Sequence, residues 1–147
     1  DVDEYCRTSL PDVYAIGDCA AHANRFAGGA TMRLESVQNA NDQAKTAVAH
    51  IVGKGEPYNA VPWFWSNQYD VRLQMVGLSQ NHDQRVLRGT TNDKGFAVFY
   101  LLEGCVIAVD AVNLPIAFMV GKQLVQQRKS VSADALSNTD IELKSLI

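Results

Sequence analysis

The run from Pro11 to Ala20 (PDVYAIGDCA) constrains this chain most, because it joins a short apolar segment to a Gly-Asp pair. Val13 to Ile16 is expected to form a strand that ends at Gly17 and Asp18. In α/β proteins, ligands bind at the carboxyl edge of the sheet, where such strands end. Gly17 has no Cβ, so a ligand can approach its backbone closely. Asp18 can accept a hydrogen bond from a ligand hydroxyl. The run therefore predicts part of an α/β domain with a binding site at Gly17 and Asp18.

Composition narrows the class of protein. The chain has 147 residues, of which 47% are hydrophobic and 20% charged, as in a globular protein with a real core. Its net charge of −3 gives no electrostatic support to nucleic-acid binding. No apolar run approaches the roughly 20 residues of a membrane span. The three cysteines are widely spaced and form no C-x-x-C pair, which favours reduced thiols in a cytoplasmic protein.

The segment from Ser36 to Val52 predicts the clearest helix, with Ser36 as its N-cap. Apolar residues recur at the spacing of one helical face. They are Val37, Ala40, Ala44, Ala47, Val48 and Ile51. We expect this face to be buried, with the side chain of Val37 in the core. The segment from Cys19 to Thr31 is expected to be a loop.

Composition changes after a linker from Gly55 to Pro62. Five β-prone segments follow, which predict an antiparallel sheet. They run over residues 64–69, 72–77, 85–88, 96–102 and 106–112. Glu103-Gly104 is a two-residue hairpin signal, and Pro115 opens a helix. A short helix at residues 133–136 and a loose tail complete the prediction.

Three segments of the sequence carry a family resemblance. The segment from Thr8 to Ala20 resembles the second FAD-binding motif of flavoprotein reductases with two dinucleotide-binding folds. The segments from Arg33 to Ala44 and from Pro62 to Tyr69 (PWFWSNQY) are similar to the ferredoxin reductases of oxygenase systems. That group includes the putidaredoxin, rubredoxin and aromatic-ring dioxygenase reductases. The resemblance extends from Val2 to about Leu136.

The resemblance implies an α+β fold in two parts. Residues 1–60 would be the end of an FAD-binding α/β domain, and residues 61–147 a small reductase carboxyl-terminal domain whose antiparallel sheet is flanked by helices. It implies FAD as the cofactor, NAD(P)H as co-substrate and a ferredoxin or rubredoxin as electron acceptor. The G-x-G-x-x-G motifs for FAD and nicotinamide are absent from the sequence. We therefore expect the carboxyl-terminal piece of a longer reductase, which needs the remainder of that chain for catalysis.

The resemblance also assigns three contacts to the flavin. Asp18, after Gly17, would hydrogen-bond the ribityl chain, and the backbone N–H of Val37 would meet the pyrimidine edge. Trp65 would lie beside the isoalloxazine ring. A helix N-terminus favours negative charge, so the helix that begins near Val37 would stabilise the reduced flavin.

The sequence also bears on metal binding, on the surface that meets a partner, and on alternative functions. No catalytic side chain and no metal site are predicted, because His22, His50 and His82 lack metal-ligand spacing. Basic residues could form a rim that meets an acidic ferredoxin. They are Arg25, Arg33, Lys45 and Arg72. Two alternatives stay open: a non-catalytic interaction module that builds a homodimer, and a flavoprotein of the apoptosis-inducing-factor type.

Overall fold

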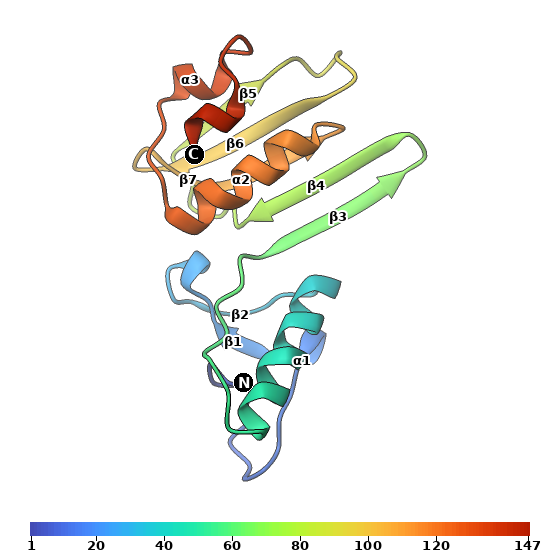
Figure 1. Ribbon diagram of the computed structural model, residues 1–147, viewed down its shortest axis with the longest axis vertical. Helices are drawn as coiled ribbons and strands as arrows, with labels where there is room; N and C mark the ends of the chain where they lie inside the picture. The colour runs from blue at the N-terminus through green and yellow to red at the C-terminus, as the bar shows by residue number, and fades with distance from the viewer. The chain divides into compact units, whose positions relative to one another are not determined.

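A computed structural model describes all residues from 1 to 147. The chain separates into two compact units, Asp1–Pro62 and Trp63–Ile147 (Figure 1). None of its helices has both the length and the apolar character needed to cross a membrane. Strands and helices mix in an α+β fold, as the sequence predicts.

Unit 1 consists of short elements followed by one long helix. In chain order these are η1 (Gly17–Cys19), β1 (Ala21–Ala23), η2 (Arg25–Ala27), β2 (Thr31–Arg33) and α1 (Val37–Ile51). β1 and β2 pair antiparallel, with His22 opposite Met32. The Ser36 hydroxyl accepts a hydrogen bond from the Asn39 N–H at 3.1 Å, which confirms Ser36 as the N-cap of α1.

Two expectations for the start of unit 1 are wrong. Residues 13–16 form no strand, because Tyr14 makes only an isolated antiparallel bridge with Arg7. A strand needs a partner along its length, and no strand of unit 1 pairs with this segment. The predicted loop from Cys19 to Thr31 contains β1 and the first residue of β2. The residues between β1 and β2 form the turn of this antiparallel hairpin.

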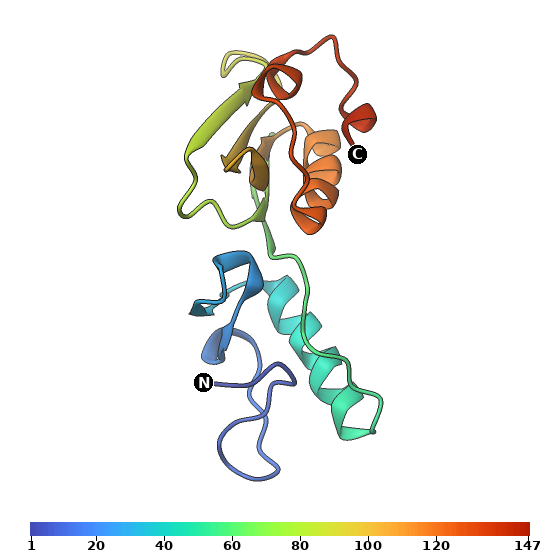
Figure 2. The same cartoon turned by 90° about the vertical axis from the view of Figure 1, so that its left-hand side faces the viewer.

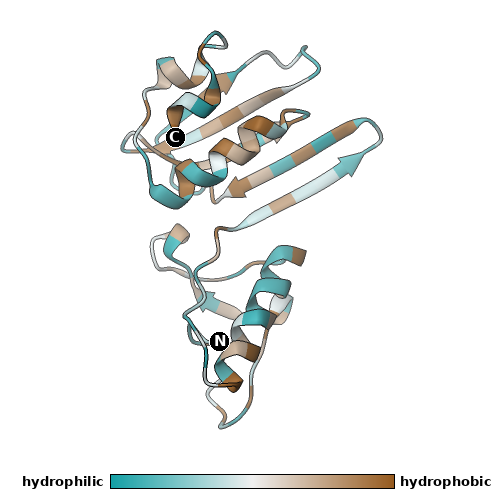
Figure 3. Cartoon of the chain, in the orientation of Figure 1, coloured by the Kyte–Doolittle hydropathy of each residue, from teal (hydrophilic) through white to brown (hydrophobic).

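The predicted apolar face of α1 is right for its alanines, since Ala47 is buried and Ala40 and Ala44 are half-buried, but wrong for its larger side chains. Val37, Val48 and Ile51 are 59%, 60% and 63% exposed, whereas Asn39 and Gln43 are fully buried. Figure 3 shows hydrophilic residues along much of this helix. The periodicity of the sequence finds the helix and the alanines of its inner side, but it misses the buried amides, which have hydrogen-bond partners in the interior. The side chain of Val37 therefore lies outside the core of unit 1.

Unit 2 is a five-stranded antiparallel sheet with helices. Its elements are β3 (Trp63–Gln68), β4 (Val71–Gly77), β5 (Gln84–Arg88), β6 (Phe96–Leu102), β7 (Cys105–Val112), α2 (Pro115–Gln127), α3 (Ala133–Ser137) and η3 (Leu143–Leu146). The strand order is β3-β4-β7-β6-β5. All five predicted strands and the helix that begins at Pro115 are confirmed, with ends that differ by at most one residue from those expected for β4, β5, β6 and β7.

One face of this sheet carries α2 (Figure 2). Gly121 permits the close approach, because a Cβ there would lie 2.6 Å from Cγ2 of Val109. The core between sheet and helices is apolar. Its fully buried members include Val76, Phe99, Leu101, Val106, Val109, Leu124, Val125 and Leu136. Glu103 and Gly104 have φ of 52° and 75°, which confirms the two-residue hairpin between β6 and β7.

Candidate functional site

The Gly17 turn is held against the first turns of α1. Gly17 has φ of 71°, and a Cβ there would lie 3.2 Å from Cβ of Ala40. Its N–H donates to Oε1 of Gln43 at 2.7 Å. Glycine is therefore required here both by its positive φ and by the contact with the helix. The following residue, Asp18, is exposed, and its carboxylate makes no hydrogen bond or ion pair in the structure.

The amino end of α1 offers an unused donor beside this turn. The first N–H groups of a helix have no partner within it. The Ser36 hydroxyl satisfies the Asn39 N–H, whereas the Val37 N–H makes no hydrogen bond in the structure. Val37 lies one helical turn before Ala40, which touches Gly17. Gly17 and the first turn of α1 are thus brought together, as a shared ligand site requires.

A buried polar network lies beneath the Gly17 turn. Asn39 donates from Nδ2 to the Leu34 carbonyl at 2.9 Å and to Oε1 of Gln43 at 3.3 Å. Its Oδ1 accepts from the hydroxyl of Tyr58 at 2.8 Å. Burial raises the pKa of Tyr58 to about 12, so this phenol stays a donor at neutral pH. The network fixes α1 to the segments that precede and follow it.

His22 extends the network into β1. Its Nδ1 lies 3.2 Å from Nε2 of Gln43, and its Nε2 lies 3.3 Å from Nδ2 of Asn24. The ring also meets Tyr58 edge-on, with 5.2 Å between ring centroids. Burial lowers the pKa of His22, because charging the imidazole there would cost solvation. The ring is therefore neutral at physiological pH.

Trp65 belongs to unit 2 and lies on its edge strand β3. It is 42% exposed, and its ring lies 5.3 Å from the ring of Trp63, measured between centroids. Trp63 in turn contacts Phe118 of α2 edge-on at 5.7 Å. The two tryptophans therefore project on the α2 side of the sheet, and Trp65 keeps a free aromatic surface. Within unit 2, it can offer a stacking surface to a planar ligand.

Some of the basic residues named from the sequence already interact with other side chains of the protein. Arg33 pairs with Glu35 at 3.2 Å, and Lys45 pairs with Asp42 at 2.9 Å. The guanidinium of Arg25 lies over the Phe26 ring, 4.6 Å from its centroid. Arg72 belongs to β4 in unit 2. The three of these residues that lie in unit 1 are exposed, and among the three only Arg25 has no carboxylate partner.

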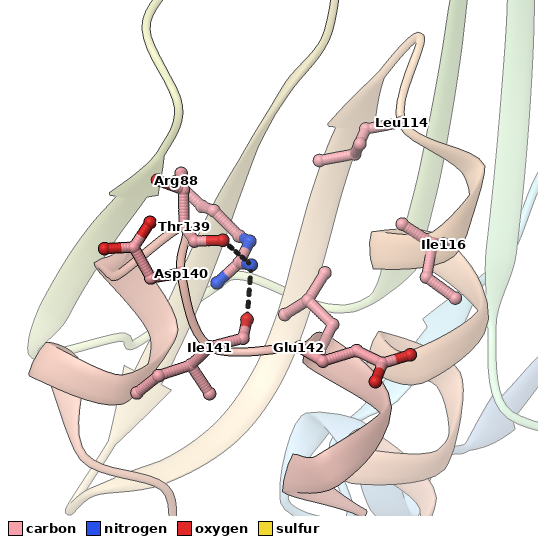
Figure 4. A pocket seen from close by; sticks show the side chains of 8 residues that line it. Arg88, Leu114, Ile116, Thr139, Asp140, Ile141 and Glu142 are labelled. Atoms are coloured by element: carbon pink, nitrogen blue, oxygen red, sulfur yellow. Dashed lines mark hydrogen bonds between the residues drawn. The ribbon is translucent and has the colours of Figure 1, made fainter.

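A pocket of about 380 Å³ in unit 2 has a structural explanation (Figure 4). Arg88 of β5 projects into it and is 7% exposed. Its guanidinium donates to four backbone carbonyls, those of Leu136, Asn138, Thr139 and Ile141, at 2.7–3.4 Å. The predicted loose tail is therefore wrong, since Arg88 holds it and Leu143 is buried. With its donors occupied by the protein, Arg88 has little left for a ligand.

Sequence reasoning missed the amide network. Asn39 and Gln43 stand four residues apart on a helix, so they share a face, and this spacing is the one available signal. Nothing in the sequence pairs them with His22 or Tyr58, which lie far along the chain. Only the fold brings these four side chains together.

Comparison with known proteins agrees with this architecture. Residues 63–147 match the family described as reductase C-terminal, and residues 1–44 match the pyridine nucleotide-disulphide oxidoreductases. The chain is 60% identical over 99% of its length to the 5,5'-dehydrodivanillate O-demethylase ferredoxin reductase subunit of Sphingobium sp. (strain NBRC 103272 / SYK-6) and covers 35% of that protein. It is 40% identical over 99% of its length to putidaredoxin reductase CamA of Pseudomonas putida and covers 34% of it.

Solved structures give the same result. The covalent putidaredoxin reductase–putidaredoxin complex superimposes with a TM-score of 0.92 at 39% identity, over 99% of this chain and 34% of that one. The ferredoxin reductase for the CYP199A2 system of Rhodopseudomonas palustris gives a TM-score of 0.91 at 40% identity, over 98% of this chain and 35% of that one. The chain thus spans about a third of the length of the relatives it matches. It belongs to the reductase C-terminal family, and its relatives are ferredoxin reductases of the pyridine nucleotide-disulphide oxidoreductase type.

Proposed function

We propose that this chain is the carboxyl-terminal part of an FAD-dependent NAD(P)H oxidoreductase that passes electrons to a ferredoxin or rubredoxin, for use by an oxygenase. Unit 1 would be the end of the FAD-binding domain, and unit 2 the reductase carboxyl-terminal domain. The relatives' names support this proposal, since they are ferredoxin reductase components. The free thiols of the three cysteines fit a reducing compartment such as the cytoplasm.

One observation carries the cofactor assignment. The Gly17 turn touches α1 at Ala40, one helical turn after the unused Val37 N–H, and Asp18 beside it has an exposed carboxylate without a partner. A ligand that fits this arrangement has hydroxyl groups for Asp18 and an electron-rich edge for the helix end. FAD has both, in its ribityl chain and in the N1–C2=O edge of its ring.

Held by Asp18, the Val37 N–H and Trp65, FAD would supply the chemistry that couples hydride transfer to single-electron transfer. The chain's own residues supply position and electrostatics. Asp18 would orient the ribityl chain by accepting a hydrogen bond from one of its hydroxyl groups. The positive end of α1 would favour the negative charge that reduction places on the pyrimidine edge. Trp65 would cover the ring and exclude water from it.

The electron acceptor would meet exposed cations. An acidic iron–sulfur protein is attracted to basic side chains, which raise the rate of encounter more than the affinity. Arg25 is an exposed cation of unit 1 that lies over the Phe26 ring and pairs with no carboxylate. Arg33 and Lys45 would contribute only after exchanging an intramolecular carboxylate for one on the partner.

FAD retention after removal of Asp18 tests the proposal. In the full-length protein, Asp18→Asn removes the charged acceptor and should weaken FAD binding by about tenfold or more, measured as flavin absorbance after dialysis. Asp12→Asn is the matched control, because Asp12 is also exposed and asparagine tolerates its φ of 59°. Equal flavin retention in both variants would remove Asp18 from the site. Absence of flavin from the unaltered protein would overturn the whole proposal.

A second candidate, a homodimerisation module, is favoured by the sheet face opposite α2. A row of paired residues crosses all five strands on this face, with no helix of unit 2 above it (Figure 2). The row runs through Phe64, Met75, Asp110, Val98 and Leu87, so apolar side chains on four strands flank Asp110 of β7. A second copy could cover such a patch. Sizing of the purified chain distinguishes the candidates: a flavin-free dimer that Leu87→Glu converts to a monomer supports the module.

A further inference from the structure

We propose that Gln43 is a positioning residue of the FAD site, and that it can hold the Gly17–Asp18 turn in place only while His22 is neutral. The inference rests on the proposed function for its ligand, but its geometry belongs to unit 1 alone. Gln43 does not face solvent, since it is fully buried one turn below Asn39. It acts on the site through the main chain of Gly17.

The side-chain amide of Gln43 links three elements. Its Oε1 accepts from the Gly17 N–H at 2.7 Å, and from Nδ2 of Asn39 at 3.3 Å. Its Nε2 faces Nδ1 of His22 on β1 at 3.2 Å. The bond to Gly17 is the short one, and it holds the residue that immediately precedes Asp18. Losing it would free the turn to move away from α1.

Backbone donors fix the orientation of both amides around His22. Because the Gly17 N–H needs an oxygen, Gln43 must present its NH₂ group to the imidazole. Because the Phe26 N–H donates to Oδ1 of Asn24 at 2.9 Å, Asn24 must also present its NH₂ group. A neutral imidazole can accept from one of these amides, but a doubly protonated ring can accept from neither.

Protonation of His22 would therefore work against the link to Gly17. The protonated ring would place an N–H against the NH₂ group of Gln43, so two donors would face each other. Rotation of the Gln43 amide removes this repulsion, but it also withdraws Oε1 from the Gly17 N–H. No carboxylate pairs with His22 to offset the charge. The one titratable group that the structure records against its ring is Tyr58, whose pKa of about 12 keeps it neutral in acid. Burial lowers the pKa of His22 itself, in agreement with this geometry.

Hydrogen exchange of the Gly17 N–H reports on its hydrogen bond to Gln43, and the measurement needs no flavin. In the purified chain, Gln43→Leu fills the same space but offers no acceptor, so the Gly17 N–H should exchange at least about tenfold faster. Asn41→Leu is the control, since it makes the same replacement at an exposed position of the same helix. It should leave Gly17 exchange within about twofold of the unaltered chain.

Two conservative variants separate positioning from general stability. Gln43→Glu keeps an acceptor for Gly17 and gives His22 a carboxylate that favours its protonated form. His22→Asn places Oδ1 near the position of Nδ1, where it can accept from Gln43 without being protonated. We expect protection of Gly17 to fall in the unaltered chain as the pH drops through the lowered pKa of His22, and to be retained at the same pH in both variants.

Flavin retention in the full-length protein completes the test. FAD should dissociate about tenfold more readily from the Gln43→Leu variant than from the Asn41→Leu control. It should dissociate on acidification from the unaltered protein but not from the His22→Asn variant. Unchanged Gly17 protection in Gln43→Leu, or an acid profile that His22→Asn leaves unaltered, would overturn the inference. If Gly17 protection follows the expected pattern but no variant binds FAD, the link stands and the proposed cofactor fails.

Discussion

The two units of this chain fill their interiors with different chemistry. Unit 2 buries hydrocarbon between its sheet and α2, with Phe99 and Leu124 fully inside. Unit 1 buries the amides of Asn39 and Gln43, together with the imidazole of His22. No buried side-chain nitrogen or oxygen lacks a polar neighbour at hydrogen-bond distance, and in a neutral His22 one of the two amide contacts is a hydrogen bond.

The two units therefore differ in the interactions that stabilise them. Burial of apolar area is non-directional and tolerates small shifts, whereas hydrogen bonds are lost once their geometry changes. Unit 1 also leaves large apolar side chains in solvent. They include Leu10, Val13, Val37, Val48, Ile51 and Val52. We infer that unit 2 is the sturdier of the two, and that unit 1 needs a covering partner to reach full stability.

Removal of a core ring should produce the largest effect. Phe99→Ala takes a fully buried side chain out of β6 and should lower the free energy of unfolding by about 3–5 kcal/mol. Urea titration followed by tryptophan fluorescence measures unit 2 selectively, because both tryptophans lie in it. Met119→Ala on α2 is the control, since Met119 is 59% exposed and should change little. A small loss in Phe99→Ala would show that the core of unit 2 is not close-packed.

Removal of Arg88 should give the next largest effect. Arg88→Met keeps much of the side-chain length but leaves four backbone carbonyls without their donor, at a cost of about 3 kcal/mol. We expect the residues after Ser137 to become sensitive to protease while the sheet stays folded. Arg85→Met is the matched control, because Arg85 lies on the same strand and is exposed. Equal protease resistance in the two variants would mean that apolar contacts hold the tail.

The sequence predicted unit 2 far better than unit 1. Alternation and turn signals located β6, β7 and the Glu103-Gly104 hairpin because neighbouring segments pair with each other. In unit 1 the same reasoning placed Val37 in the core and made a strand of residues 13–16, and both expectations failed. The interior of unit 1 depends on side-chain amides whose partners are 19 to 26 residues away, and periodicity carries no information about such pairs.

Breaking the amide network tests the weaker unit. Asn39→Leu removes one donor to the Leu34 carbonyl and the acceptor of the Tyr58 hydroxyl, so unit 1 should lose about 1–3 kcal/mol. Amide exchange resolves the two units, and we expect faster exchange within residues 1–62 alone. Asn41→Leu again serves as the exposed control. Faster exchange spread equally over both units would refute the separation of their stabilities.

Acidification should have the smallest effect, and its sign should differ between the units. Burial lowers the pKa of His22 in unit 1, so the stability it contributes is complete above its unfolded pKa of about 6.5 and is lost as the pH falls. Burial raises the pKa of Asp110 in unit 2, where Tyr100 donates to it at 2.8 Å. A raised carboxyl pKa acts in the opposite direction, because its stabilisation is complete below the unfolded value of about 3.9 and is lost as the pH rises through the folded value.

Amide exchange between pH 7.5 and pH 5 should therefore show unit 1 loosening while unit 2 does not, and His22→Asn should abolish the change in unit 1. Parallel loosening of both units would mean that His22 does not control the acid response.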